Sequence, residues 1–378
     1  LMMMGQIRFH INLVIILFLF ISPFGRLISQ EDYTKTKINP WGRFKVMLIG
    51  TDKNVGIVDA GSRLGLNVSK RINPGIKIFG GIELSIFLNT NDQFLLSPDN
   101  GSSTGFLNVT VADEGNVFGV RKGFLGADFN EYGIVSLGKQ TGAYYDVAST
   151  TDISENNSGY ASYVYTPEGS DGGASGTGRA SNSIVYKNTL GDFKIALAAQ
   201  FKLSEEKFKS IVNSVGGSVI YKLPYNLNIG AAFNNVFLDP NAGKRVRGLK
   251  GNPVYAAACL NYSTDNLFLG VMYAYQENGD LATSRDSTVV YSGYGLEIAA
   301  KWTPFKNWSV LGGVNYKQPK NEDVLINKNF CRLVYFFGMQ FEPFKDLLFY
   351  IESSVDKSVT PEGGSLPDDI SFGVKLDF

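Results

Sequence analysis

Strict alternation of apolar and polar side chains over long stretches is the feature that most constrains this chain. Within 76–88 the even positions are aliphatic apart from one glycine, whereas the odd positions include Lys77 and Glu83. A β-strand sends successive side chains to opposite faces, so this segment has one oily face and one mixed or polar face. The same split recurs at 63–69 and 371–378. The pattern predicts an all-β fold of amphipathic strands.

The connections between these runs fall into two classes. Short turns rich in Gly, Pro, Asn and Asp are predicted at 73–75, 130–133, 188–191, 223–226, 264–266, 303–306 and 342–345. Longer polar loops are predicted at 51–58, 91–115, 140–178, 203–212, 238–252, 277–290, 318–330 and 357–367. Seven turns and eight loops join sixteen strands. An even number of strands places both termini on the side of the short turns, which is periplasmic in outer-membrane barrels.

Strand length and backbone chemistry favour a barrel in a membrane. Globular strands average about five or six residues, whereas a tilted membrane-crossing strand needs about nine to eleven, and several runs here exceed the globular length. In hydrocarbon every backbone N–H and C=O must be bonded within the protein, so a sheet has to close. We predict a 16-stranded antiparallel transmembrane β-barrel with a water-filled lumen. A soluble β-sandwich with its oily faces packed together is the alternative, but it does not require turns and loops of unequal length.

The first residues are predicted to lie outside this domain. Arg8 and His10 precede an apolar run from Ile11 to Phe20, which is typical of a secretory signal peptide. We place the signal peptide at 1–29 and the barrel domain at 30–378. An uncleaved membrane anchor is the alternative for the first segment.

Charge and residue chemistry exclude several classes of function. The chain has 35 basic and 35 acidic residues, and its first 29 contain Arg8 and Arg26 but no acid, so the mature chain is nearly neutral and unsuited to nucleic acid. Its one histidine, His10, is removed with the signal peptide, which excludes Ser-His catalysis and imidazole metal ligation. We therefore expect no cofactor, no metal and no enzyme. Cys259 and Cys331 are read as unpaired, with a disulfide as the alternative.

The interval 140–178 is longer than a hairpin needs, and loops of that length are usually functional or disordered. Its Gly, Ser, Thr and Asn content is consistent with disorder. Five tyrosines instead indicate that it packs against something: Tyr144, Tyr145, Tyr160, Tyr163 and Tyr165.

A resemblance extends this interpretation. The segments 121–126, 132–133, 137–142 and 145–146 resemble the general diffusion porins of Gram-negative outer membranes. In that family an arginine-bearing strand turns tightly into a second strand, and a long loop then folds back into the barrel. The resemblance implies a homotrimeric outer-membrane porin with an inward-folded constriction loop, through which ions and small hydrophilic solutes diffuse passively.

The resemblance also implies the charged residues of the pore constriction. Asp152 and Glu155 fall where the family places its loop carboxylates, although the family's spacing is one residue wider. Glu168 and Asp171 form a competing acidic pair. The basic wall and one further lumen acid correspond to Arg43, Arg63, Arg121, Arg179 and Glu83.

Alternation supports most of these assignments. Arg63, Glu83 and Arg179 each lie on the more polar phase of their own strand. In 117–127, Phe118, Val120 and Phe124 would mark the outward phase, which directs Arg121 inward and Lys122 outward. Because an outward lysine at the bilayer midplane costs about 2–4 kcal/mol, we expect Lys122 to be shielded in the trimer contact.

Further partners follow from the same resemblance. They are outer-membrane lipid and lipopolysaccharide, small solutes, and the barrel-assembly machinery, which would read the C-terminal Phe378. A substrate-specific channel, a barrel enzyme, and a plugged structural or adhesive barrel are the competing functions.

The constriction assignment makes a first prediction. Replacing Arg121 and Arg179 together by alanine removes two positive charges from one wall, so ion selectivity should shift toward cations. The reversal potential across a planar bilayer in a salt gradient measures this shift. An unchanged reversal potential would show that neither Arg121 nor Arg179 lies in the constriction.

Overall fold

The structure is a computed structural model that describes residues 35–52, 54–88, 96–97, 108–109, 118–166, 171–201, 212–238, 246–284, 287–320 and 327–378. Contacts divide the chain into two units, Leu1–Lys35 and Thr36–Phe378, and the fold below is that of the second unit. The predicted signal peptide, 1–29, lies outside the described residues. Where the structure describes the chain, it contains no helix both long and apolar enough to cross a membrane.

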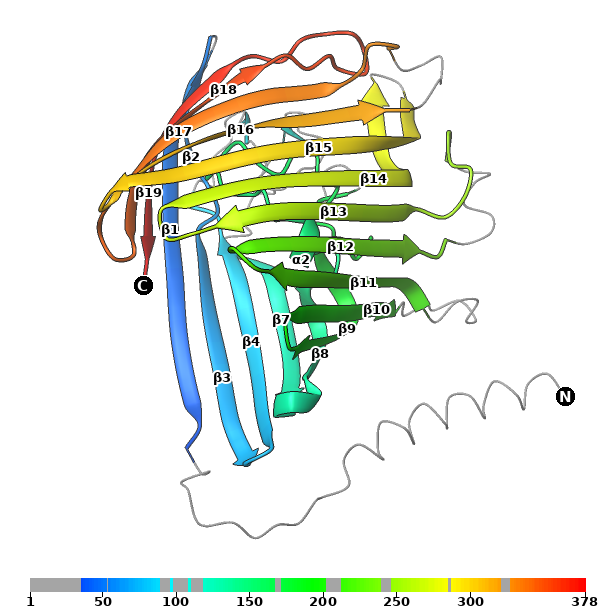
Figure 1. Cartoon of the computed structure of the whole chain (residues 1–378). Helices are drawn as coiled ribbons and strands as arrows, with labels where there is room; N and C mark the ends of the chain where they lie inside the picture. The colour runs from blue at the N-terminus through cyan, green and yellow to red at the C-terminus, as the bar shows by residue number, and fades with distance from the viewer. Residues whose placement is uncertain are drawn as a thin grey trace, which may run out of the picture. The chain divides into compact units, whose positions relative to one another are not determined.

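The described strands of the second unit form a closed antiparallel barrel (Figure 1). Strand β1 pairs with β19 on one side and with β2 and β3 on the other, which closes the sheet. β2 and β3 are two parts of one interrupted wall strand, so the described wall has the predicted sixteen strands. Their bounds are β1 (Lys37–Thr51), β2 (Val55–Asp59), β3 (Arg63–Asn73), β4 (Ile76–Ile86), β7 (Phe118–Asp128), β8 (Ile134–Thr141), β9 (Arg179–Leu190), β10 (Phe193–Phe201), β11 (Val212–Leu223), β12 (Leu227–Val236), β13 (Val254–Ser263), β14 (Leu267–Ser284), β15 (Ser287–Phe305), β16 (Trp308–Pro319), β17 (Arg332–Phe344), β18 (Leu347–Asp356) and β19 (Asp369–Asp377). The short strands β5 (Leu96–Ser97) and β6 (Asn108–Val109) pair with each other in a separate sheet.

The two faces of the wall differ as the alternation predicts. In β19, Phe372 is 50% exposed on the outer face, whereas the neighbouring Ser371 is fully buried. In β4, Ile82 is 44% exposed and Glu83 is 5% exposed. Apolar side chains therefore face outward and polar ones inward, the reverse of a soluble sandwich, which excludes that alternative.

Most connections agree with the prediction, and two do not. The short turns lie where expected; one of them contains the 3-10 helix η1 (Asn130–Tyr132). The predicted loop 51–58 is wrong in its second half, because β2 begins at Val55. The predicted loop 277–290 is also wrong, because β14 and β15 remain paired as far as Ser284 and Ser287. Polar residues there continue the strands by backbone pairing, which a hydrophobicity pattern does not report. Most of 91–115 and 203–212 lies outside the described residues.

The prediction that Lys122 points outward is wrong, and a β-bulge explains the error. Glu83 pairs with Lys122, while the next residue of β4 pairs with Val120. Arg121 is therefore the extra residue, and the alternation reverses after it. Lys122 lies on the inner face beside Glu83. Phe124, also predicted to face outward, packs against an inward ring of β4.

One close approach in the wall makes a stability prediction. A Cβ atom on Gly373 would lie 1.9 Å from Cζ of Tyr350, because the tyrosine ring covers this glycine on the neighbouring strand. Gly373→Val should therefore lower the free energy of unfolding by about 1–3 kcal/mol through overpacking. Circular dichroism during heating in detergent measures the loss. Gly56→Val is the matched control, since a Cβ there has no atom within 4 Å; equal losses in both variants would contradict the explanation.

Candidate functional site

The segment between β8 and β9 lies against the inner face of the wall. It contains the short helix α2 (Tyr145–Ala148), which contacts β11, β12, β13 and β14 (Figure 1). Tyr144, Tyr163 and Val147 are fully buried, and they pack in one cluster with the inward Cys259 of β13. The tyrosines thus attach the loop to the barrel interior, as their number suggested.

Two buried glutamates hold the next part of the loop. Glu297 on β15 accepts hydrogen bonds from the N–H of Ala161, at 2.7 Å, and from the hydroxyl of Thr151. Glu352 on β18 accepts the N–H groups of residues 155 and 156, each at 2.9 Å. Loop N–H groups that face the wall would otherwise lack acceptors, and leaving such groups unsatisfied costs about 1–3 kcal/mol each. The two carboxylates therefore fix the path of the loop inside the barrel.

Glu83 is the centre of one basic cluster. Its carboxylate lies 2.8 Å from Arg121 Nε, 3.0 Å from Lys122 Nζ and 3.3 Å from Arg63 Nη1. The bulge in β7 makes this possible, because two consecutive residues of that strand reach the same inward carboxylate.

A second group of charges joins β1, β19 and the loop. Arg43 makes a two-bonded pair with Asp377, at 2.5 and 2.9 Å. Glu155 of the loop lies 3.0 Å from Lys45 Nζ and also pairs with Lys375. The loop carboxylate is thus bound by two lysines on neighbouring strands.

The competing acidic pair is placed elsewhere. Asp171 pairs with Lys139 at 2.7 Å and with Arg179 at 3.4 Å. The Arg179 guanidinium also lies 5.6 Å from the centre of the Tyr165 ring, within cation–π range. Glu168 lies outside the described residues.

A cavity of about 330 Å³ lies between the loop and the wall. Asp152 and Glu155 line it from the loop, and Glu83 stands behind its basic partners. The four predicted arginines line it from the wall: Arg43, Arg63, Arg121 and Arg179. The structure therefore gathers the predicted site residues around one cavity, and Asp171 is not among its lining residues.

The sequence interpretation missed three lining lysines. Lys45 lies two residues after Arg43 and so on the same face of β1, and Lys375 lies on the polar phase of β19. The alternation of side chains along each strand was sufficient to identify both lysines. Lys122 could not be found in this way, because the bulge reverses the parity.

Other reactive groups do not form a second chemical site among the residues that the structure describes. No group of three or more His, Cys, Asp and Glu side chains there could hold a metal ion. Cys259 and Cys331 are both free, in agreement with the unpaired interpretation.

A closed transmembrane barrel with a charged passage inside defines a protein of the porin class, and comparisons with known proteins agree. Residues 42–324 match the Gram-negative porin family. Outer membrane protein S2 of Salmonella typhi is 23% identical over 310 residues, which cover 71% of this chain and 78% of that protein. Salmonella typhi OmpF, solved in complex with daunomycin, has a TM-score of 0.70 at 18% identity and covers 91% of this chain and 98% of its own. Vibrio cholerae OmpT, an outer membrane protein solved in a trimer form, has a TM-score of 0.63 at 14% identity, with 91% and 99% covered.

Because the family match spans most of the chain, this chain belongs to the Gram-negative porin family. It is an outer-membrane channel for the passive diffusion of ions and small hydrophilic solutes.

The Glu155 cluster makes a prediction about pH. Burial would raise the pKa of Glu155, but the ammonium groups of Lys45 and Lys375 outweigh it and lower the pKa from 4.5 to about 2. The ionised carboxylate therefore stabilises the fold above pH 4.5, and this contribution is lost as the pH falls toward 2. The difference in thermal unfolding between wild type and Glu155→Gln should be largest at neutral pH and should close between pH 4.5 and 2.

Glu131→Gln, at an exposed turn residue, is the control for this comparison. A difference between wild type and Glu155→Gln that stays constant from pH 7 to pH 2.5 would contradict the ion-pair explanation.

Proposed function

We propose that the 330 Å³ cavity is the constriction of this porin and that it sets the size and charge limits for diffusing solutes without catalysing any reaction. One observation carries the proposal: loop carboxylates and wall arginines line a single cavity from different elements. The roles follow from position. Asp152 and Glu155 form the acidic side, and Arg43, Arg63, Arg121 and Arg179, with Glu83 behind them, form the basic side.

Such an arrangement acts through its electric field. Each row of like charges is unfavourable alone, and charges of the other sign stabilise it. Water dipoles and polar solutes align in the field between the rows, whereas an apolar solute must displace ordered water to pass. Passage is therefore selective for hydrophilic solutes, and no bond needs to form or break.

The lining favours a general channel over a substrate-specific one. Among the described residues, the aromatic side chains that line the cavity are Tyr145 and Tyr165, and both lie on the loop side. A specific channel would present a longer row of aromatic contacts along the lumen. A plugged barrel is disfavoured because the loop is bonded to the wall at Glu297 and Glu352, and a cavity of about 330 Å³ lies between the described parts of the loop and the wall.

The assembled state is also part of the proposal. We propose a homotrimer of barrels spanning 30–378 after removal of the signal peptide 1–29, in contact with outer-membrane lipid and lipopolysaccharide. The trimer form of the Vibrio cholerae protein supports the oligomer. Phe378 is 58% exposed on the outer wall and packs against the Phe44 ring at 5.4 Å, a position in which the barrel-assembly machinery could read it.

Single-channel recording tests the proposal. Refolded protein inserted into a planar bilayer should give stepwise openings in groups of three, with current proportional to voltage, because three open barrels enter together. Detergent without protein, and protein unfolded by heat, are the controls. Folded and inserted protein that gives no openings would exclude the open channel, and openings only as single steps would exclude the trimer.

A further inference from the structure

The charges that line the constriction are not balanced. Besides the four arginines, three lysines line the cavity among the described residues: Lys45, Lys122 and Lys375. Within the part of the chain that the structure describes, seven basic side chains thus stand against two acidic ones, Asp152 and Glu155.

Ion pairing does not remove this excess. Glu83 is shared by three cationic side chains, and Glu155 and Asp171 are each shared by two. Asp377 differs from these three carboxylates, because the ion pair described for it has a single cationic partner, Arg43. Glu83 and Glu155 therefore each leave at least one positive charge uncompensated among the residues that line the cavity.

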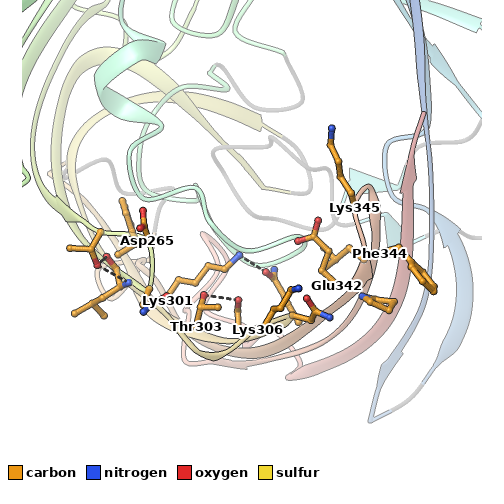
Figure 2. A pocket seen from close by; sticks show the side chains of 16 residues that line it. Asp265, Lys301, Thr303, Lys306, Glu342, Phe344 and Lys345 are labelled. Atoms are coloured by element: carbon orange, nitrogen blue, oxygen red, sulfur yellow. Dashed lines mark hydrogen bonds between the residues drawn. The ribbon is translucent and has the colours of Figure 1, made fainter.

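The excess of basic over acidic side chains is also found on the short-turn side of the barrel. A second cavity of about 670 Å³ lies among the turns that precede β14, β16 and β18 (Figure 2). Five charged side chains line it: Lys301, Lys306, Lys345, Asp265 and Glu342. Figure 2 shows the charged ends of Lys345 and Glu342 directed away from the turn that carries them.

Lys301 of β15 contributes to this second group of charges, and its ammonium group donates to the neutral amide oxygen of Gln340 at 2.6 Å. Among the described residues, the cavity on the short-turn side therefore has three basic and two acidic lining residues, the same sign of excess as the constriction.

We infer that this porin selects small anions, such as inorganic phosphate and carboxylate-bearing solutes, over cations of the same size. The inference rests on the proposed diffusion function and specifies its solute class. A passage with low-dielectric walls and one predominant sign of charge concentrates ions of the opposite sign. Guanidinium and ammonium groups also donate the charge-assisted hydrogen bonds that phosphate and carboxylate oxygens accept.

The reversal potential of the wild-type channel in a potassium chloride gradient is the direct test. Chloride should permeate at least about threefold more readily than potassium at 0.1 M salt, since focusing of this kind raises counter-ion concentration about tenfold or more. The preference should weaken at 1 M salt, because the screening length falls from about 10 Å to about 3 Å. Equal permeability or a cation preference in a conducting channel would overturn the inference and leave the proposed function intact. Absence of conductance would instead overturn both.

Substitutions of single charged residues test whether the anion preference arises at the constriction. Lys375→Gln should lower the chloride preference, and Glu155→Gln should raise it, because each changes the charge at the constriction by one in opposite senses. Lys70→Gln is the matched control: Lys70 is exposed and lies on the outward phase of β3 with Leu64 and Leu66. If Lys375→Gln fails to fold, the wild-type measurement and its salt dependence still decide the question. A shift of equal size in Lys70→Gln would show that the selectivity does not arise in the lumen.

Discussion

Every other feature of this protein depends on the requirement that backbone N–H and C=O groups be bonded inside a membrane. Pairing of β1 with both β19 and β3 meets that requirement, because it leaves the wall without an edge. Closure then assigns the faces: the outer face must be apolar, and the enclosed face is free to be polar. The charged passage exists because the sheet closes around it.

A polar interior creates its own requirement, since groups that leave water need partners. The loop between β8 and β9 supplies them by lying against the wall, where Glu297 and Glu352 accept its N–H groups. Its tyrosines pack in one cluster with Cys259 of β13. The loop is thus held by both hydrogen bonds and apolar packing, which fixes Asp152 and Glu155 relative to the arginines.

Alternation and turn chemistry were sufficient to predict the barrel, its strand number and the inward faces of most strands. These two signals did not predict the positions at which a β-bulge or backbone pairing interrupts the two-residue alternation of side chains. The bulge at Arg121 is a register change between β4 and β7, and register is a property of two strands, so neither segment alone reveals it. The sequence predicts a loop at the polar ends of β14 and β15 for a related reason, since these ends are ordered by pairing with each other. The resemblance placed Arg43 and Arg63, and parity could have added Lys45, but the sharing of Glu155 between β1 and β19 depends on tertiary contacts.

The sharing of Glu83 has a consequence for how the constriction tolerates change. Arg63, Arg121 and Lys122 each give it one bond, so the loss of any one of them leaves the carboxylate with two cationic partners. The loss of Glu83 would instead leave three positive groups crowded together with their common counter-charge gone. The cationic cluster around Glu83 therefore tolerates the loss of any one cation, whereas all three of its cations depend on the same carboxylate. Substitution of one of these cations can change the electric field at the constriction in a small step. Substitution of Glu83 changes the surroundings of all three cations at once.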